Sequence, residues 1–209
     1  MLKKSGFDGI IDCFVDTNYV FVISEIVNGK TLSDYIVENG MLSEKQVIEL
    51  FLPLLSIIAE MNKNGIHLPE ISPNNIYIID DKYLTLSGLE IIDVFVYDNN
   101  FSILPGYTAP ENYDIDSKLN TLSNVYSMAA VMYFALTGEK PQESSDRMLQ
   151  DNLNSLNEYN CDISKNSRIA ILHAMNTNQR KRTRDIYSFG SELKGSKVSF
   201  INLLKKRDK

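Results

Sequence analysis

A stretch of twenty residues without a charged side chain, 119–138, constrains the fold of this 209-residue chain more than any other feature. A segment of that length is long enough to cross a bilayer. Its first half carries polar side chains, however, and the apolar part, 125–136, has only twelve residues. Twelve apolar residues suit a helix that is buried on all sides in a protein core. We therefore expect a soluble protein with a central buried helix and no transmembrane segment.

Charge is distributed unevenly along the chain. Residues 180–209 carry ten Lys or Arg and three acidic residues, a net charge of +7. Since the whole chain has a net charge of −6, the body at 1–179 has −13. Because nucleic-acid-binding domains are usually basic, we expect no nucleic-acid partner. Cys13 and Cys161 are far apart, and the chain has only two histidines to join them. This argues against a disulfide scaffold or a zinc site and favours a cytoplasmic location.

Local patterns predict two hairpins and several helices. Short β-rich runs that flank turn residues predict strands at 9–15, 19–24, 76–79 and 83–86. A short helix is expected at 31–36. Ser43 is suited to cap a long amphipathic helix over 44–62, which Gly65 ends and Pro53 should kink. From about residue 117 onward the whole chain is expected to be helical.

Three segments occur in an informative order. The long helix is followed by the sequence IHLPEISPNNI at 66–76, an irregular stretch by PGYTAPE at 105–111, and the buried helix opens with VYSMAAV at 125–131. In this order and spacing, the chain resembles the large, helical lobe of eukaryotic-type protein kinases, particularly the bacterial Ser/Thr kinases. The resemblance runs from about Gly9 to about Leu193.

The resemblance implies an α+β fold that is mostly α. Residues 28–193 would form a kinase-like C-terminal lobe, residues 1–27 a remnant hairpin of the small lobe with the hinge, and residues 194–209 a basic tail helix. Glu25, Ile26 and Val27 fall at the hinge-like position.

The positions that resemble the catalytic loop are degenerate. Aligning Pro73-Asn74-Asn75 with the kinase motif places Glu70 where the family has its base, an Asp, and Asn75 where it has an amide metal ligand. A glutamate can accept a proton, but its extra methylene moves the carboxylate by about an ångström. Considered without the resemblance, Asn75 is a turn residue bonded to backbone.

The main metal position and the phosphate cover are also altered. Gly88 stands where the family has the Asp of its D-F-G motif, and glycine has no ligand atom. Ahead of the hinge, only Gly6 and Gly9 are available for a Gly-rich loop, and the hairpin strands offer no lysine for the phosphates. Residues that would touch the nucleotide are therefore missing.

Positions that support the lobe are retained. The resemblance implies an ion pair between Glu111 and Arg182, and it places Asn124 where the family has an Asp that caps the catalytic loop. Since support is kept and catalysis is not, the sequence favours an inactive, pseudokinase-like interaction or regulatory module. That interpretation predicts no enzymatic activity, no bound metal and no cofactor.

Two rival hypotheses remain open. The first is a divergent ATP-dependent Ser/Thr phosphotransferase that uses Glu70, Asn75, ATP and magnesium, completed in trans. The second gives the tail at 194–209 a contact with an anionic membrane or an acidic partner, although a docked terminal helix is favoured. Under the main interpretation, the hairpin at 10–24 would recruit a protein partner or a second copy, because its strand edges need cover.

Overall fold

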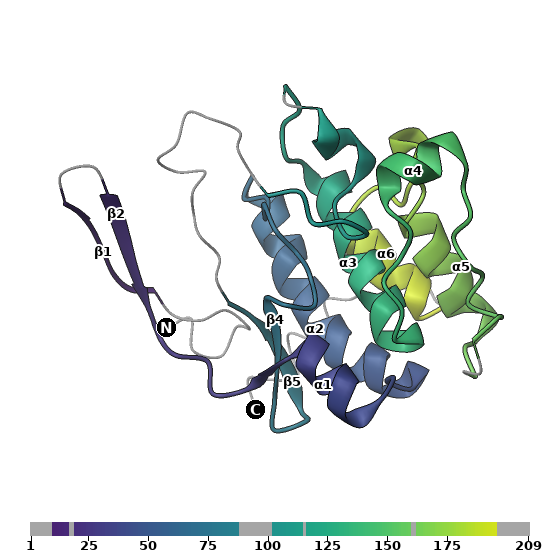
Figure 1. Cartoon of the computed structure of the whole chain (residues 1–209), viewed down its shortest axis with the longest axis horizontal. Coiled ribbons are helices and arrows are strands. Elements are labelled where there is room, and N and C mark those ends of the chain that lie inside the picture. Colours follow the sequence, from purple (N-terminus) through teal and green to yellow (C-terminus); the bar gives the residue numbers. More distant parts are fainter. Residues whose placement is uncertain (1–9, 17–18, 88–101, 115, 160–161, 196–209) are drawn as a thin grey trace.

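The computed structural model describes residues 10–16, 19–87, 102–114, 116–159 and 162–195. In chain order, its strands and helices are β1 (Ile10–Asp16), β2 (Tyr19–Ser24), β3 (Lys30–Thr31), α1 (Leu32–Asn39), α2 (Glu44–Lys63), β4 (Ile76–Ile79), β5 (Tyr83–Leu86), the 3₁₀ helix η2 (Pro110–Tyr113), α3 (Thr121–Thr137), α4 (Ser144–Leu149), α5 (Lys165–Ala174), the 3₁₀ helix η3 (Gln179–Lys181) and α6 (Ile186–Leu193). Figure 1 shows a body of helices with a small sheet along one side.

The helix α3 forms the centre of the core. All of its residues from Ser123 to Thr137 except Ser127 are buried, as the uncharged sequence predicts. Asn120 begins the helix by accepting hydrogen bonds from two backbone N–H groups of the first turn, and Gly138 ends it in the left-handed conformation. Helices α2, α5 and α6 pack around α3, so that its whole circumference is covered.

The helix α2 connects the small sheet to this core. Ser43 and Gln46 form a reciprocal capping box at its start. The helix continues through Pro53 as a single element, and the kink expected at this residue stays a prediction. One face packs against α3 and α6 and another against β5.

The small sheet is antiparallel, in the order β3-β4-β5. Ile76 and Ile78 alternate inward along β4 and are buried, and β5 pairs with β4 through Ile76↔Leu86 and Ile79↔Tyr83. Asp80 and Asp81 turn the chain between the two strands with positive φ angles, a conformation that Asp tolerates better than most residues.

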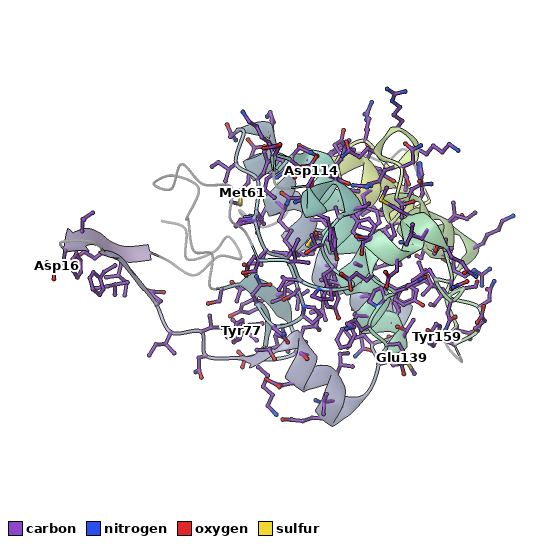
Figure 2. The ribbon with its side chains drawn as sticks, turned by 45° about the horizontal axis from the view of Figure 1, so that its top comes forward. Asp16, Met61, Tyr77, Asp114, Glu139 and Tyr159 are labelled. Carbon is purple, nitrogen blue, oxygen red and sulfur yellow. The ribbon has the colours of Figure 1, made fainter. Side chains whose placement is uncertain are left out.

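The strands β1 and β2 form a separate hairpin. They pair with each other in register from Cys13↔Val22 to Asp16↔Tyr19 and lie in a different sheet from β3-β4-β5. Figure 2 places Asp16 at the far tip of this hairpin, well away from the helical body.

One expectation needs correction, and another falls on residues that are not described. The chain after residue 117 is not helical throughout, since 139–143, 150–159 and 175–178 connect α3 to α6 without α-helix. The tail at 196–209 lies outside the described residues. Among those described, no helix has both the length and the apolar character needed to cross a membrane.

Candidate functional site

Residues 66–75 form a loop that joins α2 to β4, and a buried amide fixes its first half. Asn124 on α3 donates from Nδ2 to the carbonyl of Leu68 at 2.7 Å and accepts on Oδ1 from the N–H of Leu68 at 3.0 Å. Asn62, in the last turn of α2, donates both to Asn124 Oδ1 and to the carbonyl of Ile66, each at 2.9 Å. Two amides on two helices therefore hold the loop by its backbone.

A third amide, Asn75, closes the second half of the loop. Its Oδ1 accepts from the N–H of Ser72, and its Nδ2 donates to the carbonyl of Glu70, both at 2.9 Å. Its own backbone carbonyl accepts from the N–H of Ser87 at the end of β5, at 2.9 Å. Asn75 thus joins the loop, β4 and the end of β5 at one point.

Glu70 presents a half-buried carboxylate on this loop. Its Oε1 accepts from the backbone N–H of Ser102 at 3.2 Å, which links the loop to the segment that precedes Pro105. Since Asn75 holds the Glu70 carbonyl, the carboxylate starts from a fixed backbone. Glu70 and Asn75 therefore lie in one hydrogen-bonded turn.

The segment that follows is fixed by an ion pair within the lobe. Arg182 donates from both terminal nitrogens to the two carboxylate oxygens of Glu111, at 2.7 and 2.9 Å. The Arg182 side chain is fully buried and that of Glu111 is 12% exposed. Arg182 also donates to the carbonyls of Leu122 and Asn176, at 2.9 and 2.8 Å, so one guanidinium ties three segments together.

Several supporting residues were not singled out by the sequence analysis. Ser123 donates to Asn112 at 2.7 Å and to Glu111 at 3.1 Å, and the buried Tyr126 ring lies 5.2 Å from the Arg182 guanidinium carbon. Burial raises the pKa of Tyr126, which therefore stays a neutral phenol. Asn62 could have been found from the sequence, because it is a polar residue four positions after Ile58 on the apolar face of its helix.

The other predicted site residues, at the hinge-like position and at Gly88, are not part of this loop. Glu25, Ile26 and Val27 connect β2 to β3, and the Ile26 side chain is 96% exposed. Gly88 lies outside the described residues. Within the described ranges, no group of three or more His, Cys, Asp or Glu side chains is placed to hold a metal ion.

Comparison with known proteins gives one extensive match. The family model described as "Protein kinase domain" matches residues 5–204. Serine/threonine-protein kinase cds1 of Schizosaccharomyces pombe is 28% identical over 159 residues, which cover 70% of this chain and 35% of that protein. A probable serine/threonine-protein kinase of Clostridium acetobutylicum is 25% identical over 212 residues, covering 96% of this chain and 32% of that protein. The chain thus spans about a third of the length of these curated relatives.

The fold has a solved counterpart. The structure of Rad53 residues 1–466 in complex with AMP-PNP superposes with a TM-score of 0.73 at 20% identity, covering 90% of this chain and 50% of that one. This likeness establishes a kinase-like fold, as the sequence led us to expect.

These matches overturn two of our expectations. The chain was expected not to be an enzyme and to need no cofactor, because single catalytic positions differ from the kinase motifs. Both expectations are wrong, since a family of ATP- and magnesium-dependent enzymes matches nearly the whole chain and its relatives are Ser/Thr kinases. The motif comparison gave a few substituted positions more weight than the pattern that extends over the entire lobe.

Proposed function

Because the chain belongs to the protein kinase domain family, we propose that it is a divergent phosphotransferase that moves a phosphoryl group from ATP to Ser or Thr hydroxyls, using Glu70 and Asn75. The observation that carries the proposal is the hydrogen-bonded turn in which Asn75 holds the Glu70 carbonyl while Asn124 holds Leu68. Phosphoryl transfer depends mainly on positioning and electrostatics, and this loop is positioned from both ends.

Glu70 is the proposed acceptor of the proton from the substrate hydroxyl. Its carboxylate has two oxygens, of which Oε1 accepts one backbone N–H. The carboxylate can accept further hydrogen bonds, and an incoming hydroxyl needs one such acceptor beside it. The hydrogen bond from the Ser102 N–H ties this carboxylate to the segment that precedes Pro105.

Asn75 fits the part of a magnesium ligand. One lone pair of its Oδ1 is engaged by the Ser72 N–H, and a carbonyl oxygen has two. Amide oxygens are suitable ligands for hard divalent cations. When bound, magnesium neutralises charge on the phosphates of ATP. The role of Asn75 is to hold the cation, and that of the backbone at Glu25–Val27 is to receive the nucleotide at the hinge.

The hairpin β1–β2 is the surface through which the small lobe would be completed. Phe14 and Phe21 stack at 5.1 Å between centroids yet remain 45% and 44% exposed, and Ile11 and Val15 are exposed as well. An isolated two-stranded hairpin is marginally stable in water. We propose that a protein partner or a second copy covers it. A chain that remains monomeric by mass, with hairpin amides well protected from exchange, would contradict the proposal, because the hairpin would then need no cover.

The proposal is tested by nucleotide binding and by transfer. Saturation at about one hundred times Kd stabilises a fold by about 2.7 kcal/mol, which raises Tm by about 5–11 °C in a chain of this size. We expect that rise with ATP and magnesium, its loss in Asn75→Ala, and phosphorylation of a Ser/Thr peptide that falls by about 10²–10⁴-fold in Glu70→Gln.

Glu60→Gln is the matched control for Glu70→Gln, since Glu60 is an exposed carboxylate in the last turn of α2. The Tm of each variant without nucleotide shows whether its fold is intact. Absence of both the ATP-dependent rise and the transfer in the intact wild type would refute the proposal.

A further inference from the structure

A groove lies on the sheet side of the lobe, away from the catalytic loop. It has a volume of about 270 Å³. Buried apolar side chains form part of its wall, namely Leu42 ahead of α2, Leu50 on α2 and Ile78 on β4. The half-buried Tyr35 of α1 completes that side. Three elements thus enclose an apolar floor that can receive apolar side chains.

The rim of the groove is acidic on balance. Glu49 on α2 and Asp81 in the β4–β5 turn line it, against one cation, Lys82, and one neutral amide, Gln46. Glu49 and Asp81 are exposed, and Asp80 stands beside them on the same turn. Tyr35 and Asp81 both line the groove, and burial together with a hydrogen bond to the Asp81 carboxylate raises the pKa of Tyr35. A ligand for this surface would combine apolar and cationic groups.

The chain itself has such a segment. Residues 196–209 contain apolar side chains at 198, 200, 201, 203 and 204, followed by Lys205, Lys206 and Arg207. They hold five Lys or Arg and a single Asp. This segment lies outside the described residues, so its place is open to inference from the point where it leaves the lobe.

A series of contacts links that exit point to the helix α2, which lines the groove. Gly195 lies against Asn166 at the start of α5, so closely that an added Cβ would clash with the Asn166 amide nitrogen. The same helix start is tied to the start of α2, because Glu44 accepts from the N–H of Ser164 at 3.0 Å and from the Ser167 hydroxyl. Gln46 and Glu49 of the groove follow within two turns of α2, at about 1.5 Å of rise per residue.

The tail is long compared with the rise along α2 from Glu44 to Glu49, which is five residues or about 8 Å. Fourteen residues span about 46 Å when extended and about 21 Å as a helix. By comparison, all twenty residues of α2 extend over about 30 Å. A tethered segment also has an effective concentration in the millimolar range, which favours it over a free partner of the same chemistry.

We propose that the groove between α1, α2 and the β4–β5 turn binds the chain's own C-terminal segment, residues 196–209. Apolar side chains of the segment fill the floor, and Lys205, Lys206 and Arg207 face Glu49 and Asp81. This docking is independent of phosphoryl transfer, because the groove contains none of the residues of the catalytic loop.

Zero-length cross-linking of the full chain tests the contact directly. A carbodiimide joins carboxylates to amines that touch, and mass spectrometry of the peptides identifies the pairs. We expect cross-links from Lys205 or Lys206 to Glu49 or Asp81. Those to Glu49 should disappear in Glu49→Gln and persist in Glu60→Gln, an exposed carboxylate at the other end of α2. Absence of these cross-links, or equal yields to Glu60, would overturn the proposal.

Two further measurements separate the alternatives. When ¹⁵N-labelled and unlabelled chains are mixed, cross-links within one chain carry a single isotope, whereas mixed pairs would overturn the proposal in favour of a second copy. Reversing the three tail charges with Lys205→Glu, Lys206→Glu and Arg207→Glu should speed amide exchange around the groove by about two- to fivefold, the scale of exposed ion pairs. Unchanged exchange there would also overturn the proposal.

Discussion

Replacing Arg182 by methionine tests how the lobe is held together. The guanidinium makes two hydrogen bonds to Glu111 and donates to the carbonyls of Leu122 and Asn176, and it lies over the Tyr126 ring. Methionine fills much of the same volume but satisfies none of these acceptors. The Glu111 carboxylate, only 12% exposed, would lose its counter-charge.

The magnitude follows from that unpaired carboxylate. Breaking a buried ion pair by removing one partner costs about 3–5 kcal/mol. In a chain of 150–250 residues, where each kcal/mol shifts Tm by about 2–4 °C, Arg182→Met should lower Tm by about 6–20 °C. Thermal unfolding followed by circular dichroism, with urea denaturation beside it, measures both quantities.

Two comparison variants test whether the loss of stability comes from the ion pair. Arg184→Met removes a guanidinium whose side chain is 81% exposed, although it lies 3.1 Å from Asp185, and should cost at most about 1 kcal/mol. The double variant Arg182→Met with Glu111→Met leaves neither charge of this pair unpartnered, so it should be more stable than the sum of the single changes predicts. If Arg182→Met costs no more than Arg184→Met, or if the two changes are additive, the ion pair does not brace the lobe.

Two further substitutions test other contacts. Asn124→Asp removes the donor to the Leu68 carbonyl and should lower the free energy of unfolding by about 1–3 kcal/mol. The control Asn120→Asp should be nearly neutral, because Asp and Asn cap helices equally well. Equal urea midpoints for the two variants would contradict the role given to Asn124. The hydrogen bond from Arg147 lowers the pKa of Asp151, so this pair stabilises the fold above about pH 4 and the contribution is lost as the pH falls further. Asp151→Asn should therefore flatten the acid limb of a stability–pH profile, and an unchanged limb would refute the assignment.

Local signals were sufficient for most of the fold. The limits of β4 and β5 coincide with the runs 76–79 and 83–86, since each run has its own periodicity and flanking turn residues. The two-residue strand β3 could not be predicted in this way, because only its pairing with Tyr77 and Ile78 makes it a strand. The limits of α4 also could not be predicted from a chain expected to be helical throughout, and its contacts include η2, which is distant in sequence.

The site was predictable in its positions more than in its connections. The motif order indicated Glu70, Asn75 and Asn124, and the structure brings Asn75 to the Glu70 backbone and Asn124 to the same loop. The roles of Asn62 and Ser123 depend on which atoms meet across helices, and no spacing within one helix encodes that. The prediction of inactivity was wrong for a different reason, because it treated substituted side chains as lost functions.

The Asn62–Asn124–Leu68 attachment has a consequence for how the loop responds to its surroundings. Every partner in it is an amide, on a side chain or in the backbone, and amides neither gain nor lose a proton in the range where proteins stay folded. Added salt has little to screen in such an attachment, because it involves no net charge. Acid or salt that alters the ionic contacts elsewhere in the lobe should therefore leave the backbone of this loop in place.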